Sequence, residues 1–311
     1  MYGSRETFKY FQCLSCGCLQ IAEVPQNLGR YYPSEYYAFA PARRSPPSSH
    51  GWARRKLTAK RIEAALFHRG IVGGLLNRLL PIPPYGSQLI GSRRLGKRTW
   101  SLKSRILDVG CGNGSALLFL SQLGFEDLWG VDQFIPHDIT YSTNIRILKK
   151  SVHDVTQTFD IVMFHHSFEH MAEPLNVLRS VHRILSDEGL CQIRIPVADS
   201  YAWEHYGIHW VQLDAPRHLF LHTVKSIEIL AAQAGLDVAE VVWDSSEFQF
   251  WGSEQYLRDI PLIGDASHFK KHTNPILSTQ ELENFRMKAK ELNALGRGDQ
   301  AAFFLSKKLH D

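Results

Sequence analysis

A glycine-rich segment at 108–114 carries the clearest chemical signal in the chain. It reads Asp-Val-Gly-Cys-Gly-Asn-Gly, ends an apolar run at 105–109 and precedes a helical pattern at 115–123. Glycines let the backbone turn tightly and approach a ligand without a Cβ atom in between. These glycines stand at alternate positions, which differs from the G-x-G-x-x-G spacing of dinucleotide sites. Asp108 would repel a pyrophosphate, so the segment favours a ligand that carries positive charge.

Two further acids follow at the ends of later apolar segments. Asp132 closes the run at 128–131, and an acid after a second strand can accept hydrogen bonds from both hydroxyls of a ribose. Asp154 ends the segment 151–154, where a loop can meet the amino group of an adenine. The three acids together predict a nucleoside ligand with a cationic end.

The elements that position these acids alternate between strands and helices. Apolar stripes predict helices at 115–123, 175–185 and 224–234. Strands are expected at 105–109, 128–132, 145–148, 159–164, 190–195, 236–243 and 301–306. This alternation is typical of a parallel sheet with crossover helices. We therefore predict an α/β fold, doubly wound around a mostly parallel, seven-stranded sheet.

The chain divides into three regions by composition. Residues 1–40 form a head rich in cysteine and tyrosine, and residues 41–100 read as a linker followed by an N-terminal helical segment. Residues 101–311 form the ligand-binding domain, with an insertion of mixed character at about 245–300 before the last strand.

Composition restricts the class of partner. The chain has 311 residues, 44% of them hydrophobic, and a net charge of +4, which is too weak to indicate nucleic-acid binding. No apolar stretch is long enough to cross a bilayer, and the N-terminus has no apolar signal core. We therefore expect a cytoplasmic protein without a transmembrane segment or a nucleic-acid partner. The sequence leaves the oligomeric state open.

Four segments resemble the class I S-adenosylmethionine (SAM)-dependent methyltransferases in order and spacing. They are ILDVGCGNGS, WGVD, FDIVMFHHSFEHM and VHRILSDEGLCQIRIP, and the resemblance covers about residues 100–243. It implies a Rossmann-like methyltransferase fold with SAM as the cofactor. It places the methionine part of SAM beside the loop, the ribose at the second acid, the adenine at the third, and a closing segment over the cofactor. The implied cofactor-binding residues are Asp108, Gly110, Cys111, Gly112, Asp132, Asp154, His165 and His166.

The segment 199–218 follows the fifth strand and is rich in aromatic and ionisable side chains. Its W–D–PRH pattern resembles a bacterial methyltransferase subgroup often associated with sugar or surface-glycan pathways. The expected acceptor contacts are Tyr201, His205, Trp210 and Arg217. A base is needed only for a hydroxyl or carbon acid, and its candidates are His218, His170 and His209. Alternatively, Arg217 and His218 hold the segment in place by packing and hydrogen bonds.

Two groups of residues suggest a metal. Cys13 and Cys16 form one zinc knuckle, but the paired knuckle with which related methyltransferases often begin is missing, so zinc would need further ligands such as Cys18. The group His166, Glu169 and His170 resembles the site of some quinone-pathway O-methyltransferases, although those have an acid at the position of His166.

The expected activity is methyl transfer from SAM to a small-molecule acceptor, such as a sugar or nucleotide-sugar of a surface-glycan pathway. Two alternatives stay open at this point. One is a quinone-like or macromolecular acceptor, and the other is a non-catalytic scaffold that keeps the fold of a cofactor-binding domain.

Overall fold

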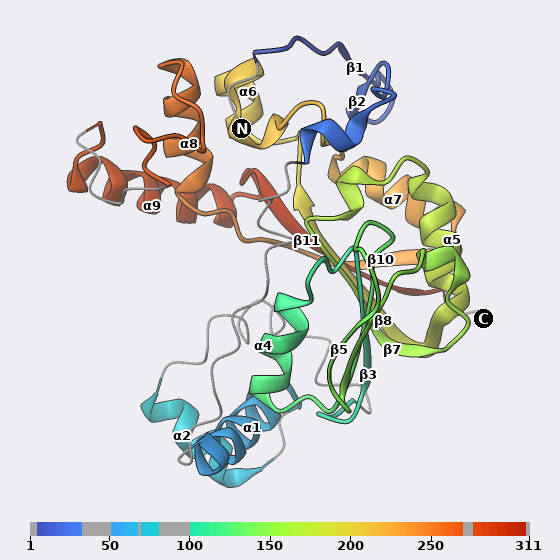
Figure 1. Cartoon of the computed structure of the whole chain (residues 1–311). Helices are drawn as coiled ribbons and strands as arrows, with labels where there is room; N and C mark the ends of the chain where they lie inside the picture. The colour runs from blue at the N-terminus through green and yellow to red at the C-terminus, as the bar shows by residue number, and fades with distance from the viewer. Residues whose placement is uncertain (1–4, 33–50, 68–69, 81–99, 270–275, 309–311) are drawn as a thin grey trace.

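A central eight-stranded sheet organises the chain (Figure 1). The computed structural model describes residues 5–32, 51–67, 70–80, 100–269 and 276–308. The strand order is β10-β11-β8-β7-β3-β4-β6-β5. The strands are β3 (Arg105–Val109), β4 (Asp127–Val131), β5 (Ile139–Ser142), β6 (Ile145–Leu148), β7 (Phe159–His165), β8 (Leu185–Pro196), β10 (Leu236–Trp243) and β11 (Gln300–Lys307). The predicted α/β fold with a mostly parallel sheet is confirmed.

The inner strands are parallel, whereas the two edges contain antiparallel pairs. β11 runs antiparallel between β8 and β10, and β5 runs antiparallel beside β6. All seven predicted strands are present, and β5 is the additional one. Its four residues alternate between half-buried and exposed positions, a pattern too short to distinguish an edge strand from a loop.

Chain order reverses on the two sides of β3, which creates the crevice where α/β sheets bind ligands. The chain passes from β3 to β4 and β6 on one side, then returns to β7 and β8 on the other. The segments that follow β3, β4 and β7 consequently converge at one edge of the sheet. Two hydrogen bonds join them: Gly110 N–H donates to the carbonyl of Val131 at 2.8 Å, and Ser167 Oγ donates to the carbonyl of Val109 at 2.6 Å.

Helices cover both faces of the sheet (Figure 1). On one face, α1 (Gly51–Phe67) and α4 (Ser115–Leu123) pack on an apolar cluster that includes Ile106 and Leu128. On the other face, α5 (Pro174–Ile184) and α7 (Val224–Gln233) pack on a cluster that includes Val162 and Ile193. Helix α2 (Ile71–Leu79) contacts α1, and both helices lie within the segment 41–100. The linker at 41–50 and the proline-rich stretch at 81–86 lie outside the described residues.

A second layer covers the end of the sheet where β8 leads into α6 (Tyr201–Tyr206) (Figure 1). Strands β1 (Tyr10–Gln12) and β2 (Leu19–Ile21) pair with β9 (Phe220–Leu221) in a three-stranded sheet. In the insertion, α8 (Phe248–Leu257) and α9 (Thr279–Ala294) pack against this layer through an apolar cluster centred on Trp210 and Phe250. The head therefore packs against the predicted acceptor segment. No described helix combines the length and the apolar character that a membrane span requires.

Candidate active site

The glycine loop between β3 and α4 adopts left-handed backbone conformations at all three glycines. The φ angles of Gly110, Gly112 and Gly114 are 73°, 52° and 76°. A Cβ atom on Gly110 would lie 2.6 Å from Cβ of Ser167, and one on Gly114 would lie 2.1 Å from Cδ1 of Ile147. Two of the three glycines are thus required by close packing against neighbouring segments, which the sequence spacing alone does not reveal.

Two buried carboxylates flank this loop. Asp132 accepts hydrogen bonds from the N–H groups of Gly112 at 2.9 Å and Phe134 at 2.8 Å, and this contact fixes the loop beside the end of β4. Asp108 is 2% exposed. Its burial, together with the nearby charge of Asp132, raises the pKa of the Asp108 carboxyl to about 7.

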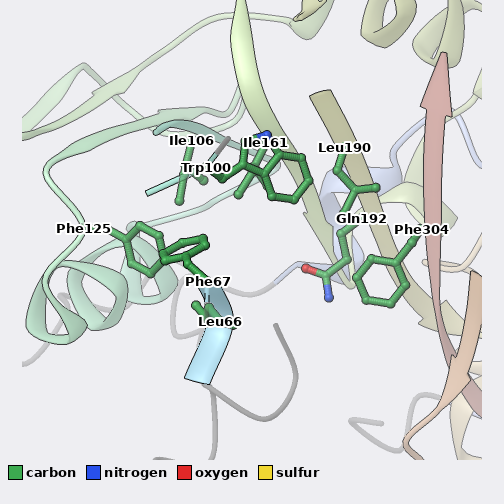
Figure 2. A pocket seen from close by; sticks show the side chains of 9 residues that line it. All are labelled: Leu66, Phe67, Trp100, Ile106, Phe125, Ile161, Leu190, Gln192 and Phe304. Carbon is green, nitrogen blue, oxygen red and sulfur yellow. The ribbon is translucent and has the colours of Figure 1, made fainter. Parts of the chain in front are cut away.

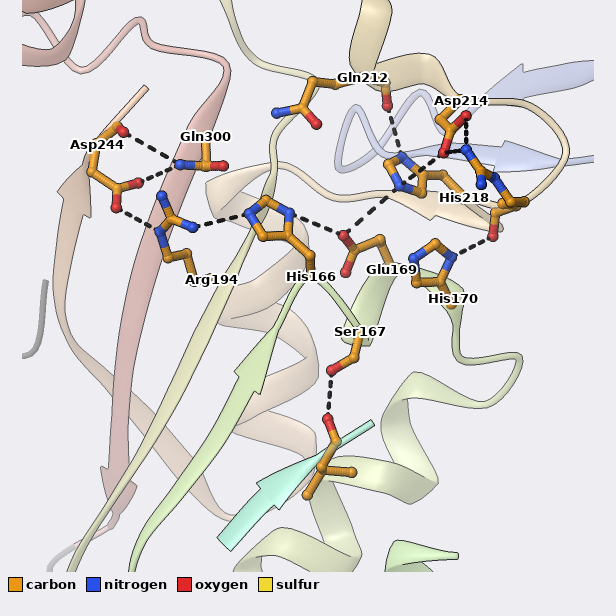
Figure 3. A network of polar contacts seen from close by, with 12 residues as sticks. His166, Ser167, Glu169, His170, Arg194, Gln212, Asp214, His218, Asp244 and Gln300 are labelled. Atoms are coloured by element: carbon orange, nitrogen blue, oxygen red, sulfur yellow. Dashed lines mark hydrogen bonds and ion pairs between the residues drawn. The ribbon is translucent and has the colours of Figure 1, made fainter. Parts of the chain in front are cut away.

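A cluster of ionisable side chains lies beside the loop (Figure 3). Glu169, on the short helix η4 (Phe168–His170), is fully buried and faces three imidazoles. His166 Nδ1 lies 3.5 Å and His218 Nε2 lies 3.9 Å from Glu169 Oε1. The rings of His170 and His218 meet edge to face with their centroids 4.8 Å apart. Ser167 connects this cluster to the end of β3.

The surroundings set the protonation of these groups. Burial and the neighbouring His170 lower the pKa of His218 to about 4. Burial alone would raise the pKa of Glu169, but the contact with His166 and the nearby imidazoles outweigh it and lower this pKa to about 2. Burial and the charge of Arg194 lower the pKa of His165 to about 3. At neutral pH the carboxylate of Glu169 therefore lies beside the neutral imidazole of His218.

A polar chain extends from the cluster across the edge of the sheet (Figure 3). His166 Nε2 lies 3.0 Å from Nη1 of Arg194 on β8, and Arg194 Nε donates to Asp244 at 2.6 Å. Gln300 on β11 donates to the other oxygen of Asp244 at 2.8 Å. This chain holds the end of β7 against β8, β10 and β11.

Comparison with known proteins identifies the family. A family model described as a methyltransferase domain matches residues 65–241, which is more than half of the chain. The chain belongs to this family. Together with the order of the sheet, the match makes it a SAM-dependent methyltransferase. No curated protein matches the chain.

Solved structures are similar to this chain at low identity. A SAM-dependent methyltransferase from Archaeoglobus fulgidus is 18% identical, with 66% of this chain and 86% of that chain covered and a TM-score of 0.40. The cyclopropane synthase MmaA2 from Mycobacterium tuberculosis is 14% identical, with 84% and 94% covered and a TM-score of 0.42. Likenesses at this level carry no argument about the acceptor.

The loop of the methyltransferase fits the cofactor that its family implies. The buried Asp108 would offer its carboxylate to the ammonium and sulfonium groups of SAM, a contact that stays a prediction, and Gly112 has a left-handed backbone without a Cβ atom. Asp132 retains lone pairs for ribose hydroxyls beside its two backbone contacts. Asp154 lies exposed on η3 (Val152–Asp154), and its contact with adenine stays a prediction. The side chain of Cys111 points towards β4. A Cβ atom added to Gly130 of that strand would lie only 2.5 Å from the Cys111 Sγ.

Two expected acceptor contacts have structural partners instead. Trp210 is fully buried in the core, and its indole N–H donates to Asp299 at 3.0 Å. Arg217 is 2% exposed and forms an ion pair with Asp214. Both side chains are buried and paired within the protein, and their contact with an acceptor stays a prediction. For Arg217, the arrangement favours the alternative that it holds the segment in place.

Three other predicted residues lie on α6 and the short helix that follows it. Tyr201 and His205 on α6 are stacked with their centroids 5.2 Å apart, and the Tyr201 hydroxyl accepts from Lys288 Nζ at 2.7 Å. His209 is half-buried on η5 (Gly207–His209). Among the described residues, no ring contact or ion pair joins His209 to the Glu169 cluster, whereas His170 and His218 belong to that cluster.

The N-terminal knuckle lies in the turn between β1 and β2. Cys13 and Cys16 are half-buried, and their neighbour Cys18 is buried with Sγ 3.9 Å from His222 Nδ1. Within the described part of the chain, no third side chain of a metal-binding type completes a cluster with Cys13 and Cys16. The structure therefore gives no support to the zinc prediction.

Sequence reasoning missed several residues that organise the site. Ser167 joins the cluster to the glycine loop, and Asp214 pairs with Arg217. The spacing of Asp214 and Arg217, three residues apart, offered a local signal for an ion pair. The partnership of Arg194 with Asp244 spans 50 residues, and no local pattern could have indicated it.

An apolar hollow lies on the face of the sheet that α1 covers (Figure 2). Its lining combines Leu66 and Phe67 of α1 with Trp100, Ile106, Phe125, Ile161, Leu190, Gln192 and Phe304. No predicted site residue contributes to it. This hollow belongs to the core rather than to the active site.

A substitution at Asp108 is expected to separate cofactor binding from stability. Because the pKa of this carboxyl is raised in the folded chain, ionising it costs free energy, and stability falls as the pH rises from about 4 to about 7. Asp108→Asn should therefore stabilise the ligand-free protein at pH 8 by on the order of 2–4 kcal/mol. It should also weaken S-adenosylhomocysteine binding about tenfold or more, because the charge that faces the ammonium is lost.

Urea unfolding at pH 5 and pH 8, with calorimetry at pH 8, measures both effects. Asp187→Asn, at an exposed carboxylate, is the matched control and should change neither quantity appreciably. Lower stability of Asp108→Asn at pH 8 would contradict the assigned cost of ionising Asp108.

Proposed function

We propose that this methyltransferase acts on a small-molecule acceptor that binds between the glycine loop and the segment 199–218. The hydrogen bond from Ser167 to Val109, 2.6 Å long, carries this proposal. It connects the predicted donor loop to the short helix on which Glu169 faces His218. In this proposal the predicted donor-binding and acceptor-binding groups lie side by side.

The cofactor, when bound, supplies an electrophilic methyl group. Asp108 and Asp132 would hold its cationic and ribose parts, and the protein's main contribution is to fix donor and acceptor in line and away from water. The imidazoles of the Glu169 cluster face the acceptor side in this proposal. A hydroxyl acceptor needs a group that removes or stabilises its proton, and His218 is our candidate for that position.

A sugar or a related hydroxyl-bearing metabolite is the acceptor class that we favour. The support comes from the W–D–PRH resemblance of the segment 199–218. Arg217 does not add support for a phosphate-bearing acceptor, because its guanidinium is paired with Asp214. Nucleotide-sugars therefore need another phosphate contact.

The test has two stages. Calorimetry with S-adenosylhomocysteine establishes the donor site first, and methyl transfer from labelled SAM to a panel of free sugars and nucleotide-sugars follows. Binding without transfer to any sugar, but with transfer to a protein or RNA fraction, would reject the proposed acceptor class. Absence of binding at millimolar ligand would contradict the donor site itself.

Asp132→Ala is expected to weaken S-adenosylhomocysteine binding by about tenfold or more, since a charge-assisted hydrogen bond contributes about 1.5–3 kcal/mol. The substitution also removes the acceptor of the Gly112 N–H, so the loop loses a local support. Asp132→Asn keeps an oxygen acceptor there and should fall between wild type and Asp132→Ala. Calorimetry of the three proteins checks the order, and equal affinities would remove Asp132 from the cofactor site.

A further inference from the structure

Three potential ligand atoms meet in the cluster around Glu169. Glu169, His170 and His218 each present one such atom, and all three atoms lie within 4.8 Å of one another. Two of these residues come from η4 and the third from the segment that precedes β9. The convergence therefore depends on tertiary structure and differs from the set on one short helix that the sequence suggested.

Backbone contacts orient both imidazoles in the same way. His170 Nδ1 lies 2.7 Å from the carbonyl oxygen of Arg217, and His218 Nδ1 lies 2.7 Å from that of Gln212. A carbonyl oxygen only accepts hydrogen bonds, so each Nδ1 must carry the proton. In the neutral rings, Nε2 then bears a lone pair, and Figure 3 shows these nitrogens turned towards Glu169. Metal-binding histidines are held by the same kind of Nδ1–H contact.

The carboxylate between these rings has few hydrogen-bond donors. Glu169 is fully buried, and no hydrogen bond from the described residues reaches either of its oxygens. Arg194 donates to His166 Nε2, so His166 Nδ1 carries a proton and faces Glu169 Oε1, but at a long distance of 3.5 Å. A buried carboxylate with so few donors is costly, and the Nε2 lone pair of His218 cannot offer it a proton. The cluster thus gathers acceptors that a cation would satisfy.

We propose that Glu169, His170 and His218 bind one divalent transition-metal ion. Two imidazoles and one carboxylate suit Zn²⁺, Mn²⁺ or Fe²⁺, with open positions left for further ligands. Mg²⁺ and Ca²⁺ fit less well, because they prefer oxygen ligands throughout. Metal binding itself does not depend on the proposed function. The additional inference that the bound ion contacts an oxygen of the methyl acceptor rests on the proposed function.

Cobalt absorption tests the site directly. We expect the metal-free full-length protein to bind one equivalent of Co²⁺ with a visible absorption band. Glu169→Gln and His170→Gln should each weaken Co²⁺ binding by about 10–100-fold or more. His182→Gln, on α5, is the matched control and should bind as wild type. His166→Gln should also retain Co²⁺ binding. This result would distinguish the proposed ligands from the set of His166, Glu169 and His170 that the sequence suggested.

Two further measurements keep the result interpretable. A Cys13→Ser/Cys16→Ser variant removes the thiolates of the N-terminal knuckle and should keep the one-equivalent band. Co²⁺ should also raise the melting temperature of the wild type but not of Glu169→Gln. A wild type without a saturable band, or a band that survives Glu169→Gln and His170→Gln, would overturn the proposal. Calorimetry with S-adenosylhomocysteine on the same samples shows independently whether the donor site is intact.

Discussion

Replacing His218 with glutamine is expected to lower methyl-transfer turnover by about 10²–10⁴-fold while affinity for S-adenosylhomocysteine stays near that of the wild type. His218 Nδ1 is held by the carbonyl of Gln212, so Nε2 is the atom left for chemistry. The lone pair on Nε2 could serve either role discussed above, by taking a proton from the acceptor or by binding a metal ion. The amide of a glutamine is a much weaker base and a much weaker metal ligand. The donor residues Asp108 and Asp132 are untouched, so cofactor binding should persist.

Turnover with an identified acceptor, calorimetry and thermal melting distinguish the two roles that the sequence left open for His218. His182→Gln on α5 is the control for the chemical change and should keep its turnover. A marked fall in melting temperature with weaker cofactor binding would favour a purely structural role. Normal turnover in a stable His218→Gln protein would remove His218 from the active site.

The sheet could be predicted because its strands are local signals. Apolar runs such as 159–164 and 236–243 are continuous where both faces are covered, and breaks such as Gly124 end the intervening helices. The start of β8 was placed at 190 rather than 185, since the polar residues 186–188 interrupt its apolar pattern. In the structure Leu185 pairs with Phe159 of β7, and the register then shifts before pairing resumes at Leu190, so the strand includes an irregular stretch.

The site was less predictable because orientation is decided by distant contacts. Trp210 and Arg217 have the chemistry of ligand-binding residues, yet each is buried against a carboxylate, Asp299 and Asp214 respectively. The Glu169–His218 contact joins residues 49 positions apart in the numbering, through the packing of β9 and η4. Motif spacing identified the segments that contribute to the site, but it could not tell which side chains face inward.

Arg217→Met is expected to destabilise the protein by about 3–5 kcal/mol, because it leaves the buried carboxylate of Asp214 without its partner. Burial by itself would raise the pKa of Asp214, but the charge of Arg217 outweighs it and keeps the pKa below its usual value. The stabilising contribution of the pair is therefore present above pH 4 and is lost as the pH falls through the lowered pKa. The guanidinium also lies over the ring of Tyr32, 5.8 Å from its centroid, and this contact is lost as well.

A double variant separates the ion pair from packing. Asp214→Asn removes the charge and keeps a residue that tolerates the left-handed backbone at this position, where φ is 36°. Adding it to Arg217→Met should recover more than half of the lost unfolding free energy, since no buried charge then remains unpaired. Urea unfolding at pH 7.5 measures both steps. If Arg217→Met unfolds like the wild type and instead raises KM for an anionic acceptor at unchanged kcat, then Arg217 binds the acceptor, as the sequence resemblance implied, and does not anchor the segment.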